Sequence, residues 1–279
     1  MSIEIHTNGV VYTVSSPEIG YSVQIAVAIQ HIPTVPFGYN LWDNGVARDY
    51  RTSKASFLMS QSDTASLIDI FANKNKERGI SATLRLGAGS SAGSGYYPFG
   101  PDHGDRGDFD VRILTVDPGP QLEEPWLWYR TVLEMVEESN PAYVLPAEQD
   151  EGDVEIGTID GLRWPQTFPA PGISYGNTTQ LTRNGTAYTV DKRADADSYT
   201  TNMPMRLRQN KAAALIDHLV TTVRAANVTI TPGASNGYIF GAQKGEGPFV
   251  CNWLDEVVPI SHTGWDQFEF PLNFQYVSG

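Results

Sequence analysis

An internal repeat constrains the fold of this chain more than any other feature of its sequence. Four short segments recur in the same order in its two halves: residues 65–69 match 213–217, 97–100 match 238–241, 109–114 match 249–254, and 126–135 match 265–274. The spacing of the matches falls steadily from 148 to 139 residues, as small loop deletions in one copy would produce. Collinear matches of this kind predict two tandem copies of one domain.

The start of the repeat can be aligned in two ways. Residues 8–14 (NGVVYTV) and residues 44–47 (NGVA) both resemble the segment 184–190 (NGTAYTV). Either the first copy carries an insertion around residues 15–43, or an extra hairpin precedes it. In both alignments the Asn-Gly pair predicts a tight hairpin turn, because these two residues tolerate positive φ angles.

The first copy is expected to contain one amphipathic helix. Ser60 or Ser62 is its candidate N-cap, since a hydroxyl can accept a hydrogen bond from a free backbone N–H. Residues Leu67, Ile68 and Phe71 form the apolar stripe. A left-handed C-terminal cap is assigned to Gly79.

The second copy is expected to contain the matching helix, with Asn210 as the candidate cap and Asn227 in the place of Gly79. Asn, like Gly, tolerates the left-handed conformation. The apolar stripe consists of five residues: Leu215, Ile216, Leu219, Val220 and Val223.

The rest of each copy has the pattern of β-strands. Strands are predicted at residues 80–86 and 108–115 in the first copy and at 228–231 and 249–258 in the second. The last strand of each copy shows period-two alternation, which places every second side chain on one face. This face consists of Tyr129, Thr131, Leu133 and Met135 in the first copy and of Phe268, Phe270, Leu272 and Phe274 in the second. We expect this face to pack under the helix, which gives a mainly β (α+β) fold of two tandem β-sandwich or barrel domains.

The predicted domains are residues 1–136 and 173–279, joined by a linker at 137–172. Five prolines and an acidic run, residues 148–155, make this linker stiff and solvated, with a short ordered piece near Trp164. A period-two run at residues 20–30 has no obvious counterpart in the second copy. It is either an ordinary sheet strand, which is favoured, or an arm that pairs with a neighbouring subunit.

Charge and composition exclude several classes of protein. A formal net charge of −13 repels phosphate backbones and argues against specific nucleic-acid binding. There is no apolar run of 18 residues, so no membrane span is expected. The N-terminus lacks the pattern of a secretory signal, and the single cysteine, Cys251, cannot form an intrachain disulfide. These features favour folding in a reducing cytosol.

Motifs for catalysis are absent from the sequence. It has no Gly-x-Ser-x-Gly elbow, no P-loop and no dinucleotide fingerprint, and its histidines lack metal-ligand spacing. We therefore expect no enzymatic activity and no cofactor. The strongest candidates for metal ligands are Asp102, Asp105 and Asp108, whose carboxylates are of the kind that bind calcium. The matching loop, 241–247, lacks nearly all of these carboxylates, so a solvated turn is favoured and no metal site is expected.

Aromatic residues on the predicted strands raise one alternative function. Trp126, Trp128, Trp253 and Trp265 lie at or near matching positions of the two copies. Aromatic rings on a sheet face can stack on sugars, which would suit a carbohydrate- or receptor-binding module of a phage or bacterial surface system. Repeated placement in both copies fits shared core or interface packing better.

The sequence as a whole resembles phage tail proteins of the tail-tube-like superfamily. The resemblance is carried by the duplicated β-domain with one helix, by residues 56–59 (SFLM) leading into the helix at 65–71, and by residues 37–40 (FGYN) before the Asn44-Gly45 turn. It implies a non-enzymatic structural component of the distal tail or baseplate hub, located at the tail tip of the virion after folding in the host cytoplasm.

The resemblance also implies partners. Proteins of this superfamily form rings around a channel through sheet edges, arms and loops, and three chains with two domains each would give a pseudo-sixfold ring. A trimer is therefore favoured over a hexamer. The implied neighbours are the tail tube protein, the tape measure and other baseplate proteins. The acidic charge is similar to that of tail lumens, which let DNA pass without binding it.

Overall fold

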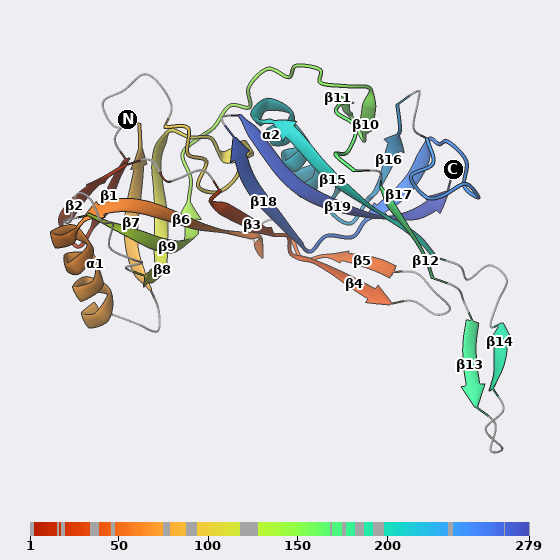
Figure 1. Cartoon of the computed structure of the whole chain (residues 1–279), viewed down its shortest axis with the longest axis horizontal. Coiled ribbons are helices and arrows are strands. Elements are labelled where there is room, and N and C mark those ends of the chain that lie inside the picture. The colour runs from red at the N-terminus through yellow and green to blue at the C-terminus, as the bar shows by residue number, and fades with distance from the viewer. Residues whose placement is uncertain are drawn as a thin grey trace.

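The computed structural model in Figure 1 describes residues 3–15, 17, 20–33, 39–45, 48–74, 79–87, 94–117, 128–167, 169–174, 177–181, 187–191, 198–233, 237–264 and 266–278. The chain is mainly β, with 53% of it in strands, most of which belong to one large antiparallel sheet. Two α-helices accompany the strands within the described part of the chain. No described helix is both long enough and apolar enough to span a membrane.

The described residues of the first half, 3–139, form nine strands, one helix and a short 3-10 turn. In order they are β1 (Ile3–Thr7), β2 (Val10–Val14), β3 (Ser22–Ala26), β4 (Ile29–Pro33), β5 (Tyr39–Asp43), β6 (Tyr50–Ser60), α1 (Gln61–Lys74), β7 (Ile80–Leu86), η2 (Pro101–His103), β8 (Gly107–Asp117) and β9 (Trp128–Ser139).

In the second half, 154–278, the residues that the structure describes form ten strands, one helix and a π-helical turn that continues the helix. In order they are β10 (Val154–Ile156), β11 (Ile159–Leu162), β12 (Ala170–Ser174), β13 (Asn177–Leu181), β14 (Ala187–Asp191), β15 (Ser198–Arg208), α2 (Gln209–Asp217), η3 (His218–Val223), β16 (Asn227–Thr231), β17 (Phe249–Trp253), β18 (Val257–Gly264) and β19 (Gln267–Ser278).

The two halves pair their strands in the same order. The first runs β3-β6-β9-β8-β7-β1-β2, and the second runs β12-β15-β19-β17-β16-β10-β11, with antiparallel neighbours throughout. A separate hairpin, β4–β5 or β13–β14, lies between the edge strand and the long strand before the helix in each half. Figure 1 shows the β13–β14 hairpin projecting away from the rest of the molecule.

The registers of the two halves also agree. Ser53 lies opposite Met135 between β6 and β9, as Thr201 lies opposite Phe274 between β15 and β19. The β8–β9 ladder shifts register just after Asp110, and the β17–β19 ladder shifts just after Val250. Strand order alone does not require such an irregularity at a fixed place. The shared shift therefore identifies the equivalent strands of the two halves.

The run at residues 20–30 has a counterpart after all. Val23 and Ile25 are buried, as the alternation predicted, but the run is split between β3 and β4. In the second half, β12 takes the place of β3, and the β13–β14 hairpin takes the place of β4–β5. In order and pairing, β3, β4 and β5 therefore correspond to β12, β13 and β14. This correspondence is hard to see in the sequence, because SVQIA in β3 and APGIS in β12 are identical at only one aligned position, Ile25 and Ile173.

The predicted linker, 137–172, is partly built into the sheets. Strand β9 continues to Ser139, β10 and β11 form a hairpin on the edge of the second half, and β12 begins at Ala170. Residues 140–153 alone connect the halves outside any strand or helix. The predicted strand at 249–258 is likewise divided into β17 and β18.

The N-terminal cap of the first helix follows the prediction, but the helix ends at Lys74, five residues before Gly79, and the second helix departs from the prediction at both ends. The Ser60 hydroxyl accepts a hydrogen bond from the Asp63 N–H at 3.1 Å, and Gly79 has a φ of +71°. The α2 helix begins one residue before Asn210, and its first N–H donates to the Asp266 carbonyl at 2.9 Å. The left-handed residue after η3 is Arg224, with a φ of +41°, because Asn227 already belongs to β16.

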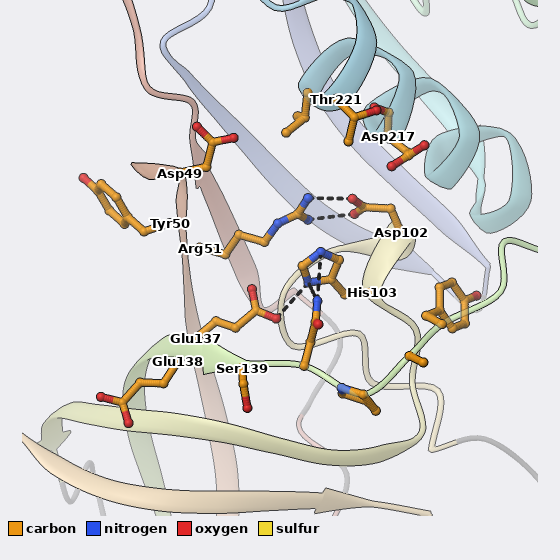
Figure 2. Close-up of a pocket in the computed structure, with 15 residues that line it drawn as sticks. Asp49, Tyr50, Arg51, Asp102, His103, Glu137, Glu138, Ser139, Asp217 and Thr221 are labelled. Atoms are coloured by element: carbon orange, nitrogen blue, oxygen red, sulfur yellow. Dashed lines mark hydrogen bonds and ion pairs between the residues drawn. The ribbon is translucent and has the colours of Figure 1, made fainter. Parts of the chain in front are cut away.

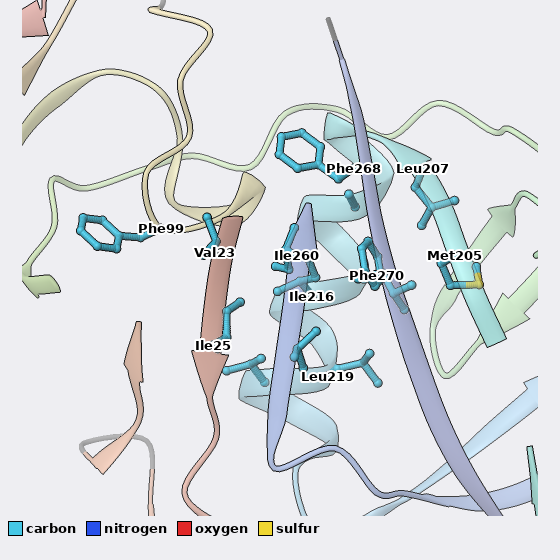
Figure 3. Packing of buried hydrophobic residues seen from close by; sticks show 14 of the residues in the cluster. Val23, Ile25, Phe99, Met205, Leu207, Ile216, Leu219, Ile260, Phe268 and Phe270 are labelled. Atoms are coloured by element: carbon cyan, nitrogen blue, oxygen red, sulfur yellow. The ribbon is translucent and has the colours of Figure 1, made fainter. Parts of the chain in front are cut away.

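The core lies between the helices and the long strands. The stripe predicted for α2 is wholly buried, and Figure 3 shows Ile216 and Leu219 against β18 and β19, with Phe270 nearby. The predicted face of β19 is also buried. In α1, Leu67 is buried, whereas Ile68 and Phe71 are half-exposed.

Candidate functional site: the junction between the halves

The two halves meet edge to edge in one continuous sheet. Strand β18 pairs with β3, so that Val258 lies opposite Ile25 and Ile260 opposite Val23. Each of these four side chains is at most 2% exposed. Full burial of a valine or isoleucine side chain contributes about 1.5–3 kcal/mol. The junction is therefore part of the hydrophobic core rather than a loose contact between domains.

The break between β17 and β18 lets β18 reach the other half. The buried carboxylate of Asp255 accepts hydrogen bonds from Trp253 Nε1 at 2.8 Å and from the N–H and Nδ2 of Asn273 at 2.8 and 2.6 Å. These bonds stabilise the turn between β17 and β18. At the matching place in the first half there is no such turn, and β8 continues to pair with β9. No periodic pattern in the sequence predicts this turn, because it depends on one aspartate side chain.

An arginine at the end of η3 clamps the second half to the first. Arg224 donates to both carboxylate oxygens of Asp43 at 2.7 Å and to Asp49 at 2.6 Å, and it is only 5% exposed. Its hydrogen bonds to Asp43 and Asp49 raise its pKa, and the bond from Arg224 lowers the pKa of Asp43. Bidentate pairs fix orientation as well as proximity. The clamp therefore holds the β5–β6 connection of one half against the helix of the other.

A second ion pair lies just inside the first half. Arg51 makes a bidentate pair with Asp102 at 2.6 and 2.7 Å and donates to the Phe99 carbonyl at 2.7 Å; both side chains are nearly buried (Figure 2). The pair fixes the η2 turn. Gln209, the first residue of α2, donates to the Pro101 carbonyl in that turn at 3.1 Å. Arg51 thereby supports the contact between η2 and α2.

A hollow of about 470 Å³ lies beside these pairs, lined by both halves (Figure 2). Two pairs of side chains in its lining are in contact: Arg51 with Asp102, and His103 with Glu137 at 2.8 Å. The Ser139 hydroxyl donates to Asp110. The pKa of Asp217 is raised by burial and then by the charge of Asp102, as expected beside another carboxylate. The two contacts connect the η2 turn with β6 and β9.

The three candidate metal ligands, Asp102, Asp105 and Asp108, each interact with a different partner. Asp102 pairs with Arg51, Asp105 accepts a hydrogen bond from the Gly95 N–H at 2.8 Å, and Asp108 makes a bidentate pair with Arg85. No group of three possible ligands gathers around one point within the described ranges. The structure therefore directs these carboxylates to three separate structural partners.

Part of the acidic run is structural rather than solvated. Lys211 of α2 is fully buried, and its Nζ lies 2.8 Å from Glu148, 3.3 Å from Asp150 and 2.7 Å from the Asp160 carbonyl. Burial alone would lower the pKa of Lys211, but the hydrogen bonds to Glu148 and Asp150 outweigh burial and raise it. The connection between the halves is thus tied to α2. Sequence reasoning missed this, because an isolated lysine in a helix carries no sign of burial.

The aromatic and sulfur candidates fall mostly into the core. Trp253 is fully buried, Trp128 is 36% exposed, and Trp126 and Trp265 lie outside the described residues. Burial raises the pKa of the Cys251 thiol to about 12, which makes it a poor nucleophile. These positions offer no row of exposed tryptophans among the residues described.

In comparisons with known protein families and with curated proteins, no family and no protein matches this chain.

Proposed function

We propose that this chain is a non-enzymatic structural component of the tail tip or baseplate of a long-tailed phage. In this proposal the two halves are copies of one tail-tube-like domain, and the chain forms a ring that joins the tail tube to tip or fibre proteins. The observation that carries the proposal is the β3–β18 junction, at which two halves with the same strand order and register join through unlike edges.

The nature of this junction favours a ring. A contact between two different surfaces of similar units is heterologous, and repeated heterologous contacts close into rings when the rotation permits. Three chains would supply six similar units, which is why a pseudo-sixfold trimer is proposed. The net charge of −13 would keep DNA from adhering to such a channel.

The arrangement of charges favours scaffolding over catalysis. Arg51, Arg224 and Lys211 each hold one or more carboxylates at 2.6–2.8 Å, and all three are at most 7% exposed. Such pairs hold elements in place. A general base, by contrast, needs a carboxylate or imidazole that is free to accept a proton from a substrate.

The proposal is tested by the mass and shape of the purified protein. Light scattering after size-exclusion chromatography is expected to give three chains of 30.6 kDa each, and negative-stain images are expected to show a ring with six lobes. An antibody against the chain is expected to label one end of the tail on virions that carry it. A monomer at high concentration, together with unlabelled tails, would overturn the proposal.

A further inference from the structure

The imidazole of His262 is buried at one end of the junction between the halves. His262 follows Ser261, the last β18 residue that pairs with β3, and its backbone N–H donates to the Tyr21 carbonyl at 3.4 Å. Its ring stacks on that of Tyr21 in the first half, with 5.0 Å between centroids, and lies 5.1 Å from the ring of Phe268 in the second. His262 is 6% exposed and Tyr21 is 5% exposed. One histidine therefore packs between aromatic rings that belong to opposite halves.

Neither ring nitrogen of His262 has a hydrogen-bond partner among the residues that the structure describes. A neutral imidazole carries one donor and one acceptor, whereas the protonated ring carries two donors and a positive charge. A charge that is buried without a partner costs far more than a neutral polar group. Burial accordingly lowers the pKa of His262 below its ordinary value of 6.5. The junction thus accommodates the neutral ring and disfavours the protonated one.

The titratable groups packed around these rings come from other parts of the chain. Burial raises the pKa of Tyr21, Tyr96 and Tyr97, so these phenols stay neutral throughout the range in which a histidine titrates. The carboxylate of Asp266, in the turn between β18 and β19, opposes the lowering of the His262 pKa but does not overcome the effect of burial. Protonation of His262 in the joined form is therefore unfavourable near neutral pH.

The opposite end of the same ladder is held by charged pairs. Val257 pairs with Ala26 there, and two residues beyond Ala26 a backbone N–H donates to Asp49 at 2.7 Å. Asp49 belongs to the clamp that Arg224 forms with Asp43. The hydrogen bond from Arg224 lowers the pKa of Asp43, so this pair stays charged in mild acid. Mild acid is thus expected to weaken the two ends of the junction unequally.

We propose that His262 is a pH-sensitive switch, and that its protonation opens the β3–β18 ladder from the Ser22–Ser261 end while the Arg224 clamp holds the other end. Opening lets water solvate the charged imidazole, and it exposes apolar side chains of β3 and β18 that Figure 3 shows packed at the junction. This switch goes beyond the function proposed above and does not depend on it.

The direction of the pH effect follows from the lowered pKa of His262. The joined form binds fewer protons than the open form, in which the imidazole is solvated. This contribution to the junction is therefore present above about pH 6.5 and is lost as the pH falls through the pKa that His262 has in the joined form.

Hydrogen exchange of the whole chain at pH 7.5 and pH 5, corrected for the intrinsic effect of pH on exchange, measures the opening. In the wild type, the protection of residues 22–24 and 260–262 is expected to fall by about tenfold or more. Residues 80–86 of β7 provide the internal reference and are expected to change by less than about twofold. His262→Phe keeps an aromatic ring in the stack but cannot titrate, so its fall at residues 22–24 is expected to stay below about twofold. His6→Gln, at a partly exposed histidine of β1, is the matched control and is expected to keep the wild-type fall.

Three results would overturn the switch. The first is equal protection of residues 22–24 at the two pH values in the wild type, and the second is a fall of wild-type size in the His262→Phe variant. The third is an equal loss of protection at residues 80–86, which would mean global unfolding rather than opening of the junction. The comparison within the wild-type chain decides the question even where the variant fails to fold. All of these results are independent of the mass and shape that test the proposed function.

Discussion

The helices α1 and α2 occupy the same place in the two halves but differ greatly in burial. In α2, seven of nine residues are buried, whereas Thr64 and Leu67 alone are buried between Gln61 and Ala72 of α1. Their patterns are similar: Leu67 and Ile68 match Leu215 and Ile216. The sequence pattern therefore sets which face of each helix turns inward, but does not set how much of the rest is covered.

The difference comes from what packs on each helix. The η2 turn of the first half contacts the start of α2, Tyr143 accepts a hydrogen bond from Gln209 at 2.8 Å, and the acidic connection is held by Lys211. Helix α1 lies at the outer end of the molecule, where none of these elements reach it (Figure 1).

The largest expected effect is a difference in stability loss between alanine substitutions at two matching isoleucines, Ile216 in α2 and Ile68 in α1. Ile216→Ala is expected to lower the free energy of unfolding by about 2–5 kcal/mol, because it leaves a cavity in a packed core. Ile68→Ala is expected to cost less than about 1.5 kcal/mol in the isolated chain, since its side chain is half-exposed. Urea denaturation of both variants at a concentration below assembly measures the difference. Equal losses would mean that α1 is buried as deeply as α2.

A smaller effect is expected from Lys211, which stands where α1 has Asp63. Lys211→Met is expected to cost about 1–3 kcal/mol, because Glu148 and the Asp160 carbonyl lose a charged hydrogen-bond donor. The exposed Lys54 provides the control, and Lys54→Met is expected to change stability by less than about 0.5 kcal/mol. Hydrogen exchange should also speed up at residues 148–160 in the first variant alone. Unchanged exchange there would show that the connection does not depend on Lys211.

Features that depend on local periodicity could be read from the sequence. The buried face of β19, that of β9 from Thr131 onward, the stripe of α2, the Ser60 cap and the hairpin turn at Asn8-Gly9 all follow from residues close together in the chain. Each has a physical reason that operates over a few residues. Prediction was accurate for them because no distant partner changes the outcome.

Features that depend on distant partners could not be read in this way. The match of β3 to β12 is one of position and register, since the buried Val23 is replaced by an exposed Pro171. The clamp joins Arg224 to aspartates about 180 residues earlier, and a single arginine carries no sign of such a partner. Charged residues are ordinarily solvated, so the burial of Lys211 and Arg224 ran against the prior expectation.

The smallest expected effect is on the pH dependence of stability. It arises from His218 in the second half, whose matching residue in α1 is Ile70. Burial lowers the pKa of His218 below its ordinary value of 6.5, although Asp217 opposes the shift. The folded state therefore binds fewer protons than the unfolded state, so this contribution to stability is present above about pH 6.5 and is lost as the pH falls through the folded-state pKa. His218→Gln is expected to reduce the fall in the denaturation midpoint between pH 7.5 and pH 5.

His262, whose pKa burial also lowers, remains in this variant and accounts for a residual slope. Because α1 has no histidine at the matching position, Ile70→Val serves as the control and should leave the slope unchanged. An identical pH profile for His218→Gln and the wild type would mean that His218 titrates alike in the folded and unfolded chains, and that the second half owes none of its acid sensitivity to this helix.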